Sequence, residues 1–301
     1  MGQLCSKNAQ VPSRQIDTEP EISLKTFDNK EIDKFYDLQE NKFNFLRKLN
    51  FEDYFYSLVR FSNENATLED DYSKAATLDY NMKSSSFYTE LFTSDLFQSF
   101  IENKIFKHKA LYETIGKNEK MATIFKDTFL NANNALGLKL AQNAKDQGNE
   151  NADKNTIVTK VHAIAYGILY CCGQNSTKVK TLFKLFQEDG KVKQNEMLDQ
   201  FLLALAIIPS YGMASARQKL AKNEEIGPIT KEELTKLVNF SELKDCVNLV
   251  GIMNINLFGE NKSDSLAYDQ FKQKFDSESR NSVNFMLTPK GIRYMLIQNN
   301  I

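Results

Sequence analysis

The first residues of the chain match the pattern for N-terminal myristoylation. Gly2 becomes the acceptor once the initiator methionine is removed, and Ser6 stands at the hydroxyl position of the pattern. One myristoyl chain holds a membrane only marginally, so stable anchoring needs a second signal, which Cys5 can supply by carrying a palmitoyl chain. The sequence therefore predicts a lipid anchor at Gly2 and Cys5 on a flexible tether of residues 1–30. The alternative is a chance match.

The loop around Gly190 contains part of the oxygen pattern that binds Ca²⁺ in EF-hands. An EF-hand loop takes ligands from positions 1, 3, 5, 7, 9 and 12 and has glycine at position 6. With Gly190 at position 6, Glu196 falls at position 12 and Asp189 lies beside the turn. Positions 1 and 3 are then Leu185 and Gln187, so two acidic ligands are missing. This loop is expected to bind Ca²⁺ weakly or not at all.

A second stretch, residues 259–270, has the full length of such a loop. Asn261 and Ser263 stand at positions 3 and 5, but Gln270 stands where a bidentate glutamate is needed. Neither a resident metal nor another cofactor is therefore predicted. The weak metal-ligand candidates are Asp189, Glu196, Asn261 and Ser263.

An apolar residue stands at position 8 of both loops, where paired EF-hands join their short strands. These residues are Val192 and Leu266. The pattern predicts a degenerate EF-hand-like pair, and the alternative is two ordinary helix–turn–helix units. A third candidate loop, residues 79–90, has Lys83 at position 5 and carries little weight.

Apolar residues recur at three- and four-residue intervals along most of the chain, which is typical of amphipathic helices. Strictly alternating stretches are nearly absent, so the expected fold class is all-α, with helical lobes and the degenerate pair in the C-terminal half. The helical blocks fall within residues 32–61, 91–105, 124–129, 157–169, 179–186 and 230–247.

A polar segment without periodic apolar residues, 142–155, divides the chain. The division predicts an N-terminal helical domain at residues 31–141 and a pseudo-EF-hand helical domain at residues 156–301. The longest apolar run, residues 201–208, is far shorter than the roughly 20 residues that span a bilayer, so it predicts a core helix.

An apolar groove is expected between the helices of the pair. Open EF-hand pairs expose a concave apolar surface that binds a helical or extended segment of another protein. The alternative is that the same residues simply close the core. The expected lining residues are Phe186, Met197, Phe201, Leu205, Met253, Phe258 and Phe271.

Few residues have the types and spacing that catalysis requires. His108 and His162 share no metal-ligand spacing with each other or with a cysteine. His162 is expected in the core and His108, between two lysines, in solvent. The thiols of Cys171 and Cys172 lie near Lys178 in sequence, which favours a lowered thiol pKa, although buried inert thiols are the commoner outcome. Without a phosphate-binding or nucleophile motif, the chain is predicted not to be an enzyme.

Composition and charge limit the classes of protein to which the chain can belong. The 301 residues include 38 Lys and Arg against 39 Asp and Glu, a net charge of -1 that disfavours a general electrostatic grip on nucleic acid. The 42% hydrophobic and 26% charged residues are typical of a globular protein. The four cysteines form no CxxC pair and follow no apolar signal peptide, which favours a reducing cytoplasm.

The N-terminal pattern followed by helix–loop–helix units resembles the myristoylated EF-hand proteins, such as calcineurin B and the neuronal calcium sensors. The stretch from Lys180 to Val192, KTLFKLFQEDGKV, followed by Glu196, is more similar to the divergent EF-hand-like region that precedes the TLDc domain in myristoylated TLDc proteins. The sequence departs from that family because it ends at Ile301 without room for a TLDc domain. The resemblance implies a membrane-tethered adaptor that docks on a partner protein.

The expected function is a non-catalytic adaptor or scaffold, lipid-anchored at the cytoplasmic face of a membrane. It binds another protein through the pseudo-EF-hand lobe and binds no nucleic acid. Two alternatives stay open. One is a Ca²⁺-responsive sensor with a myristoyl switch, and the other is a structural subunit of a large assembly, for which the N-terminal match is accidental.

Overall fold

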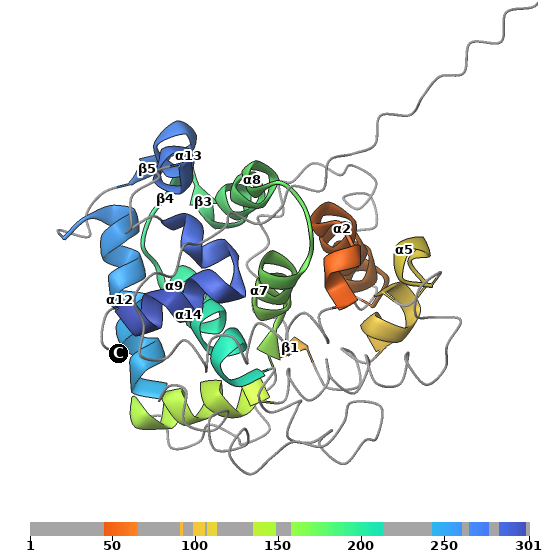
Figure 1. The fold of residues 1–301 in the computed structure, drawn as a ribbon, viewed down its shortest axis with the longest axis horizontal. Helices are drawn as coiled ribbons and strands as arrows, with labels where there is room; N and C mark the ends of the chain where they lie inside the picture. Colours follow the sequence, from red (N-terminus) through yellow and green to blue (C-terminus); the bar gives the residue numbers. More distant parts are fainter. Residues whose placement is uncertain are drawn as a thin grey trace, which may run out of the picture.

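The computed structural model describes residues 45–65, 91–92, 99–105, 107–112, 135–148, 158–212, 243–260, 265–276 and 283–298. These residues are mainly helical (Figure 1). The strands among them form one sheet of two strands and one of three. The predicted all-α class is confirmed.

The described helices differ widely in length, whereas each described strand is only two residues long. The helices are η1 (Phe45–Lys48), α2 (Phe51–Asn65), η3 (Ile101–Ile105), α5 (Lys109–Leu111), α7 (Lys160–Tyr170), α8 (Asn175–Phe186), α9 (Glu196–Ile207), η5 (Ile208–Gly212), α12 (Leu243–Phe258), α13 (Tyr268–Asp276), η6 (Val283–Leu287) and α14 (Pro289–Gln298). The strands are β1 (Leu91–Phe92), β2 (Val158–Thr159), β3 (Gln187–Glu188), β4 (Lys191–Val192) and β5 (Leu266–Ala267). A further helix covers residues 135–146.

Helix α7 lies at the centre of the described residues, and every residue from 161 to 170 is buried. α2 packs against one side of it and α9 against another (Figure 1). The Tyr54 hydroxyl of α2 donates to the Ala163 carbonyl at 2.8 Å. A Cβ at Gly167 would come within 2.6 Å of Tyr54 ring atoms, so the close crossing of α2 and α7 depends on glycine at this position.

The N-terminus of α2 is tied to the end of α7 by backbone bonds. The Cys172 N–H donates to the Leu49 carbonyl at 3.0 Å, and the Phe51 N–H donates to the Cys172 carbonyl at 2.8 Å. The Glu52 N–H donates to the Asn50 side-chain oxygen at 2.9 Å, which caps the helix. The buried apolar stripe of α2 then follows the predicted helical spacing.

Two expectations about helices need correction. Leu91 and Phe92 form a strand instead of the start of a helix, and they pair with Thr159 and Val158. Val158 and Thr159 likewise precede α7 as strand β2, although the sequence predicted helix from residue 157. A strand of two residues is too short to show a period, so the helical spacing around it prevails in a sequence analysis.

The apolar run of residues 201–208 forms a buried helix, as predicted. Pro209 does not end the helical path, because the chain continues into the π-helical turn η5. Proline lacks the N–H that an α-helix uses, and a wider turn accommodates that loss. The Ser210 hydroxyl donates to the Ala206 carbonyl at 3.0 Å and satisfies one of the carbonyls of this last turn.

The buried apolar residues described between Leu46 and Leu296, other than Ala135 and Ala141, form one cluster. The helix at residues 135–146 runs into the polar segment that the sequence suggested as a boundary. The division at residues 142–155 stays a prediction.

Candidate functional site

The first helix–loop–helix unit consists of α8, a short hairpin and α9. The hairpin pairs Gln187 with Val192 and turns at Asp189 and Gly190, whose φ angles are 51° and 78°. Positive φ at both central residues is typical of a two-residue type I′ turn, and Asp-Gly suits it. The Gly190 N–H donates to Gln187 Oε1 at 2.8 Å. The side-chain oxygen at ligand position 3 is therefore engaged by the backbone.

The second unit consists of α12, β5 and α13. Residues 261–264 of its loop, with the candidates Asn261 and Ser263, lie outside the described residues. The Ala267 N–H, directly before α13, donates to Gln270 Oε1 at 3.0 Å. This bond is one half of a capping box, in which the third helical residue satisfies the N-cap amide. Gln270, at the position of the bidentate glutamate, therefore caps its own helix.

The strands β4 and β5 join the two units. They pair antiparallel, with Val192 opposite Leu266 and Lys191 opposite Ala267. Val192 is 0% exposed and Leu266 is 6% exposed. The predicted join at position 8 is confirmed, so the two helix–loop–helix units are paired through their loops.

Each helix of one unit packs against a helix of the other. α8 contacts α13 through Phe183, whose ring centroid lies 5.8 Å from that of Phe271 and 5.1 Å from that of Tyr268. Between α9 and α12, Asn254 Nδ2 donates to Asp199 Oδ1 at 2.7 Å. The four helices therefore surround one shared groove.

The described candidates for a metal site do not converge on a point. Asp189 is exposed at the hairpin turn, and Glu196 is the first residue of α9. Glu196 Oε1 accepts a hydrogen bond from Gln200 Nε2 at 3.2 Å. Within the part of the chain that the structure describes, no group of three or more His, Cys, Asp and Glu side chains could hold a metal ion.

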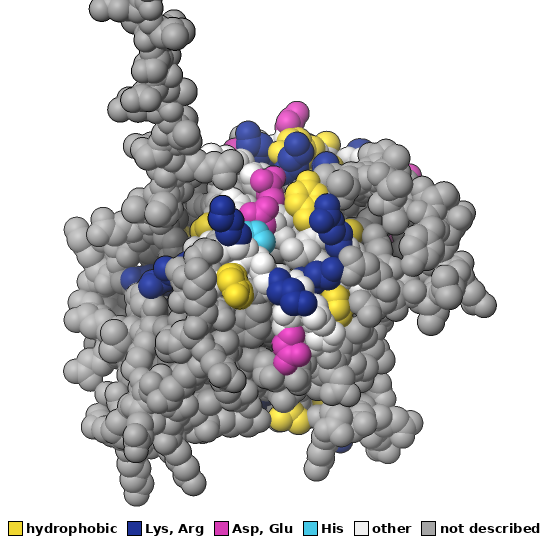
Figure 2. Space-filling view, turned by 90° about the vertical axis from the view of Figure 1, so that its right-hand side faces the viewer, with side chains coloured by type: hydrophobic (Ala, Val, Ile, Leu, Met, Phe, Trp, Pro, Cys, Tyr) yellow, Lys and Arg dark blue, Asp and Glu magenta, His cyan; other side chains and the backbone are white. Residues whose placement is uncertain are grey.

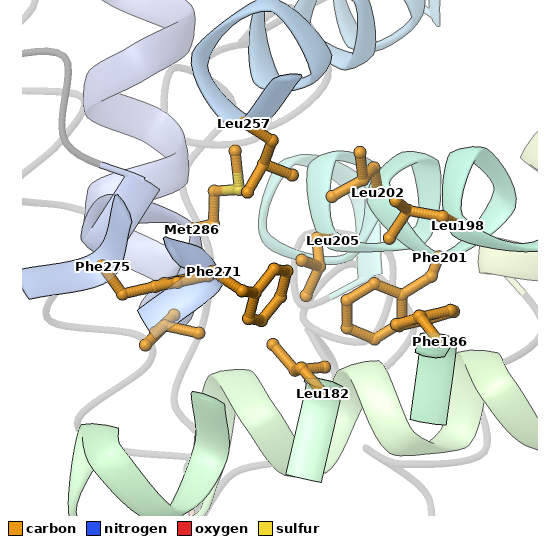
Figure 3. A pocket seen from close by; sticks show the side chains of 11 residues that line it. Leu182, Phe186, Leu198, Phe201, Leu202, Leu205, Leu257, Phe271, Phe275 and Met286 are labelled. Atoms are coloured by element: carbon orange, nitrogen blue, oxygen red, sulfur yellow. The ribbon is translucent and has the colours of Figure 1, made fainter. Parts of the chain in front are cut away.

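The groove between the four helices is apolar and nearly filled (Figure 3). Side chains from α8, α9, α12 and α13 point toward one another across it. The space left has a volume of about 10 Å³, close to what one water molecule needs, and an apolar space of this size stays dry. The lining residues are Leu182, Phe186, Leu198, Phe201, Leu202, Leu205, Leu257, Phe271, Phe275, Met286 and Leu287.

The structure places the seven predicted groove residues in two groups. Those that line the groove are Phe186, Phe201, Leu205 and Phe271. The other three lie outside it: Met253 and Phe258 are buried elsewhere in the core, and Met197 is partly buried against the core. The ring centroids of Phe186 and Phe201 lie 5.0 Å apart, so α8 and α9 are in direct aromatic contact within the groove wall.

The C-terminal segment of the chain itself covers the groove. Met286 and Leu287 of η6 are 1% and 0% exposed and lie among the lining residues. The Gly291 N–H donates to the Thr288 hydroxyl at 3.0 Å, which caps the start of α14. Sequence analysis missed this segment. Its signal was the spacing of Val283, Met286 and Leu287 at i, i+3 and i+4, which is that of a helix in a groove.

The histidines lie in different surroundings. His162 is 4% exposed, as predicted for a core residue, and burial lowers its pKa from 6.5 to about 4. The side chain of His108 is 28% exposed, less solvated than the sequence suggested, and its Nε2 lies 3.6 Å from Asp53 Oδ2. The lysines on either side of His108 are exposed.

Burial has the largest effect on the pKa of the two adjacent thiols, Cys171 and Cys172. It raises the pKa of the Cys171 thiol well above its usual value, and Lys178, which acts in the opposite direction, does not offset it. Burial also raises the pKa of the half-buried Cys172, whose thiol donates to the Leu49 carbonyl at 3.3 Å. Lys178 Nζ donates to the Ile168 carbonyl at 2.7 Å. Both cysteines are therefore protonated thiols near neutral pH, as predicted for the buried alternative.

The predicted lipid acceptors Gly2 and Cys5 and the third candidate loop at residues 79–90 lie outside the described residues. Of the helices that are described, none is both long and apolar enough to cross a bilayer.

The fold and groove described above define an all-α protein with two helix–loop–helix units joined by a short sheet. Comparison of the chain with protein-family models, with curated proteins and with solved structures finds no match.

Proposed function

We propose that the protein is a membrane-tethered, non-catalytic adaptor that binds a segment of a partner protein through the groove of its EF-hand-like pair. One observation carries the proposal. The groove already holds a helical segment, η6, whose residues Met286 and Leu287 line it and are 1% and 0% exposed. Val283 of the same segment is also buried, at 2% exposed. A partner segment with the same i, i+3, i+4 spacing of aliphatic or methionine side chains has the chemistry to replace it.

The loops support binding that is independent of Ca²⁺. The Gln187 side-chain oxygen accepts the Gly190 amide, and the Gln270 side-chain oxygen accepts the Ala267 amide. These oxygens stabilise the two loops in the positions where a cation would otherwise hold them. The two loops are therefore held by hydrogen bonds between their own backbone amides and side chains, and β4 and β5 join them.

The free-energy cost of exposing η6 means that a partner segment must displace η6, because an empty groove is rarely populated. Exposing Val283, Met286 and Leu287 costs roughly 5–9 kcal/mol of lost burial. A cost of that size leaves fewer than about one molecule in a thousand open, since each 1.4 kcal/mol is a factor of ten. A partner must restore the same burial, and its apparent affinity is reduced by the small open fraction. We therefore expect a selective adaptor.

The groove proposal is tested with a labelled synthetic peptide of residues 283–301 as the partner mimic. The full chain with Leu287→Ala, which weakens the chain's own segment, is expected to bind the peptide at least about tenfold more tightly than the unchanged chain. Binding should be equal in excess Ca²⁺ and in chelator.

Gln298→Ala is the matched control, because Gln298 is an exposed residue of the adjoining helix α14. It should bind the peptide as the unchanged chain does. Equal binding by all three chains, or none by any, would contradict an exchangeable groove. Binding that requires Ca²⁺ would support the sensor instead.

The tether is tested by intact mass of the full chain made in a eukaryotic cell. We expect the mass increment of a myristoyl group, lost in Gly2→Ala, and a second increment that depends on Cys5. The myristoylated chain should sediment with membranes and Gly2→Ala should not. An unmodified N-terminus in the unchanged chain would contradict the tether and favour the assembly subunit.

A further inference from the structure

Basic side chains gather on the side of the molecule formed by η1, α2, η3 and α5 (Figure 2). Among the described side chains of residues 45–61 and 99–112 there are six Lys or Arg against three Asp or Glu, an excess of three positive charges in a chain of net charge -1. The six are Arg47, Lys48, Arg60, Lys104, Lys107 and Lys109, and all except the half-buried Lys104 are exposed.

Packing brings these residues together from separate elements. α5, which begins at Lys109, packs against η1, which carries Arg47 and Lys48. Lys107 lies in the turn just before α5. The 3.6 Å approach of His108 Nε2 to Asp53 Oδ2 joins the same turn to the first turn of α2. The basic surface is thus built from parts of the chain about 60 residues apart in sequence, and the local sequence did not show it.

Residues 187–199, which comprise the β3–β4 hairpin and the start of α9, carry four Asp or Glu against two Lys. Figure 1 places this hairpin on the other side of the molecule from α5. This segment therefore has a small local excess of negative charge, whereas the side formed by η1, α2, η3 and α5 has an excess of positive charge.

An exposed aromatic residue accompanies the basic side. Tyr112, directly after α5, is 47% exposed. Tyrosine is enriched where proteins meet lipid headgroups, because its ring is apolar and its hydroxyl is polar. Nucleic-acid surfaces also use basic and aromatic residues, but the net charge of -1 disfavours a general electrostatic grip on nucleic acid, and the N-terminal myristoylation pattern favours a membrane as the anionic partner.

We propose that the side formed by η1, α2, η3 and α5 binds the anionic lipid headgroups of a membrane. The proposal deepens the tether of the proposed function. A myristoyl chain alone gives an association constant of only about 10⁴ M⁻¹. Three net positive charges near an anionic surface strengthen binding on the order of 100-fold. The basic side then faces the lipid, and the β3–β4 hairpin faces away from it.

The test uses the full chain made in bacteria, which lacks the lipid, and sedimentation with vesicles of phosphatidylcholine alone or mixed with phosphatidylserine. We expect binding to the anionic vesicles that weakens as salt is raised. The variant with Lys48→Glu, Lys107→Glu and Lys109→Glu should lose at least about tenfold in binding, because its local excess changes from positive to negative.

The matched control is the variant with Lys180→Glu, Lys191→Glu and Lys193→Glu, which reverses three exposed lysines away from the basic side and changes the net charge equally. It should bind anionic vesicles nearly as the unchanged chain does. Equal losses in the two variants, or no preference for phosphatidylserine, would overturn the proposal, as would binding to single-stranded RNA without binding to vesicles. Substitution of the same three lysines by Gln provides a milder version if the reversal variant unfolds.

Failure of this proposal is distinguishable from failure of the proposed function, since the bacterial protein carries no lipid. Vesicle binding without a myristoyl increment in the eukaryotic protein would support the basic side and contradict the tether. A myristoyl increment without vesicle binding by the bacterial protein would support the tether and contradict the basic side.

Discussion

Replacement of Leu287 by alanine is expected to lower the free energy of unfolding by about 2–5 kcal/mol. Leu287 is 0% exposed and lies in the groove wall, where the remaining space is about 10 Å³. The removed carbon atoms leave a cavity that the closely packed rings around it cannot fill without moving. Urea unfolding of the full chain, followed by helical circular dichroism, measures the loss.

Gln298→Ala is the control for this experiment, because Gln298 is exposed on α14 and its loss should change stability by at most about 0.5 kcal/mol. Equal stability of the two variants would mean that η6 rests on the groove without filling it. In that case the pair would hold its shape through β4, β5 and the helix contacts alone, and peptide exchange would need no opening cost.

The join between the two units could be predicted from the sequence because it depends only on the positions of residues within each loop. With Gly190 at position 6 of the first loop, Val192 falls at position 8. With Gly259 at position 1 of the second loop, Leu266 falls at position 8 as well. Counting also places Gln270 at the position of the bidentate glutamate, and the weak or absent Ca²⁺ binding expected from it stays a prediction. The structure adds that this side chain caps α13.

The occupant of the groove was not accessible in this way. The spacing of Val283, Met286 and Leu287 shows that one face of η6 is apolar, but not which surface that face covers. η6 contacts α12 and α13 but also α8, which lies about 100 positions earlier in the chain, and a local pattern carries no information on such contacts. Groove residues chosen from sequence therefore included Met253, which is buried elsewhere in the core.

The thiols illustrate a second kind of limit. The sequence showed Lys178 near Cys171 and Cys172, and a nearby cation lowers a thiol pKa. Burial acts in the opposite direction, and its size depends on the tertiary fold. In the structure burial is the larger effect, so the pKa of both thiols is raised. Where two opposing effects meet, a sequence supplies their signs but not their magnitudes.

The stability of the protein is expected to fall by about 2 kcal/mol between about pH 7 and pH 5 because of His162 alone. Burial lowers the folded-state pKa of His162 to about 4, whereas the unfolded value is 6.5. Between these two values the unfolded chain binds a proton that the folded chain does not. The contribution is therefore fully present above pH 6.5 and is lost as the pH falls toward 4.

Urea unfolding at the two pH values measures this loss, and His162→Gln separates it from the titration of carboxylates. The variant keeps a neutral polar side chain that does not titrate, so its loss of stability between the two pH values should be smaller by about 2 kcal/mol. Gln298→Ala is the control and should keep the full loss, because Gln298 is exposed and does not titrate. A pH dependence that His162→Gln leaves unchanged would show that the imidazole is protonated inside the fold, which places a hydrogen-bond acceptor or a negative charge beside α7.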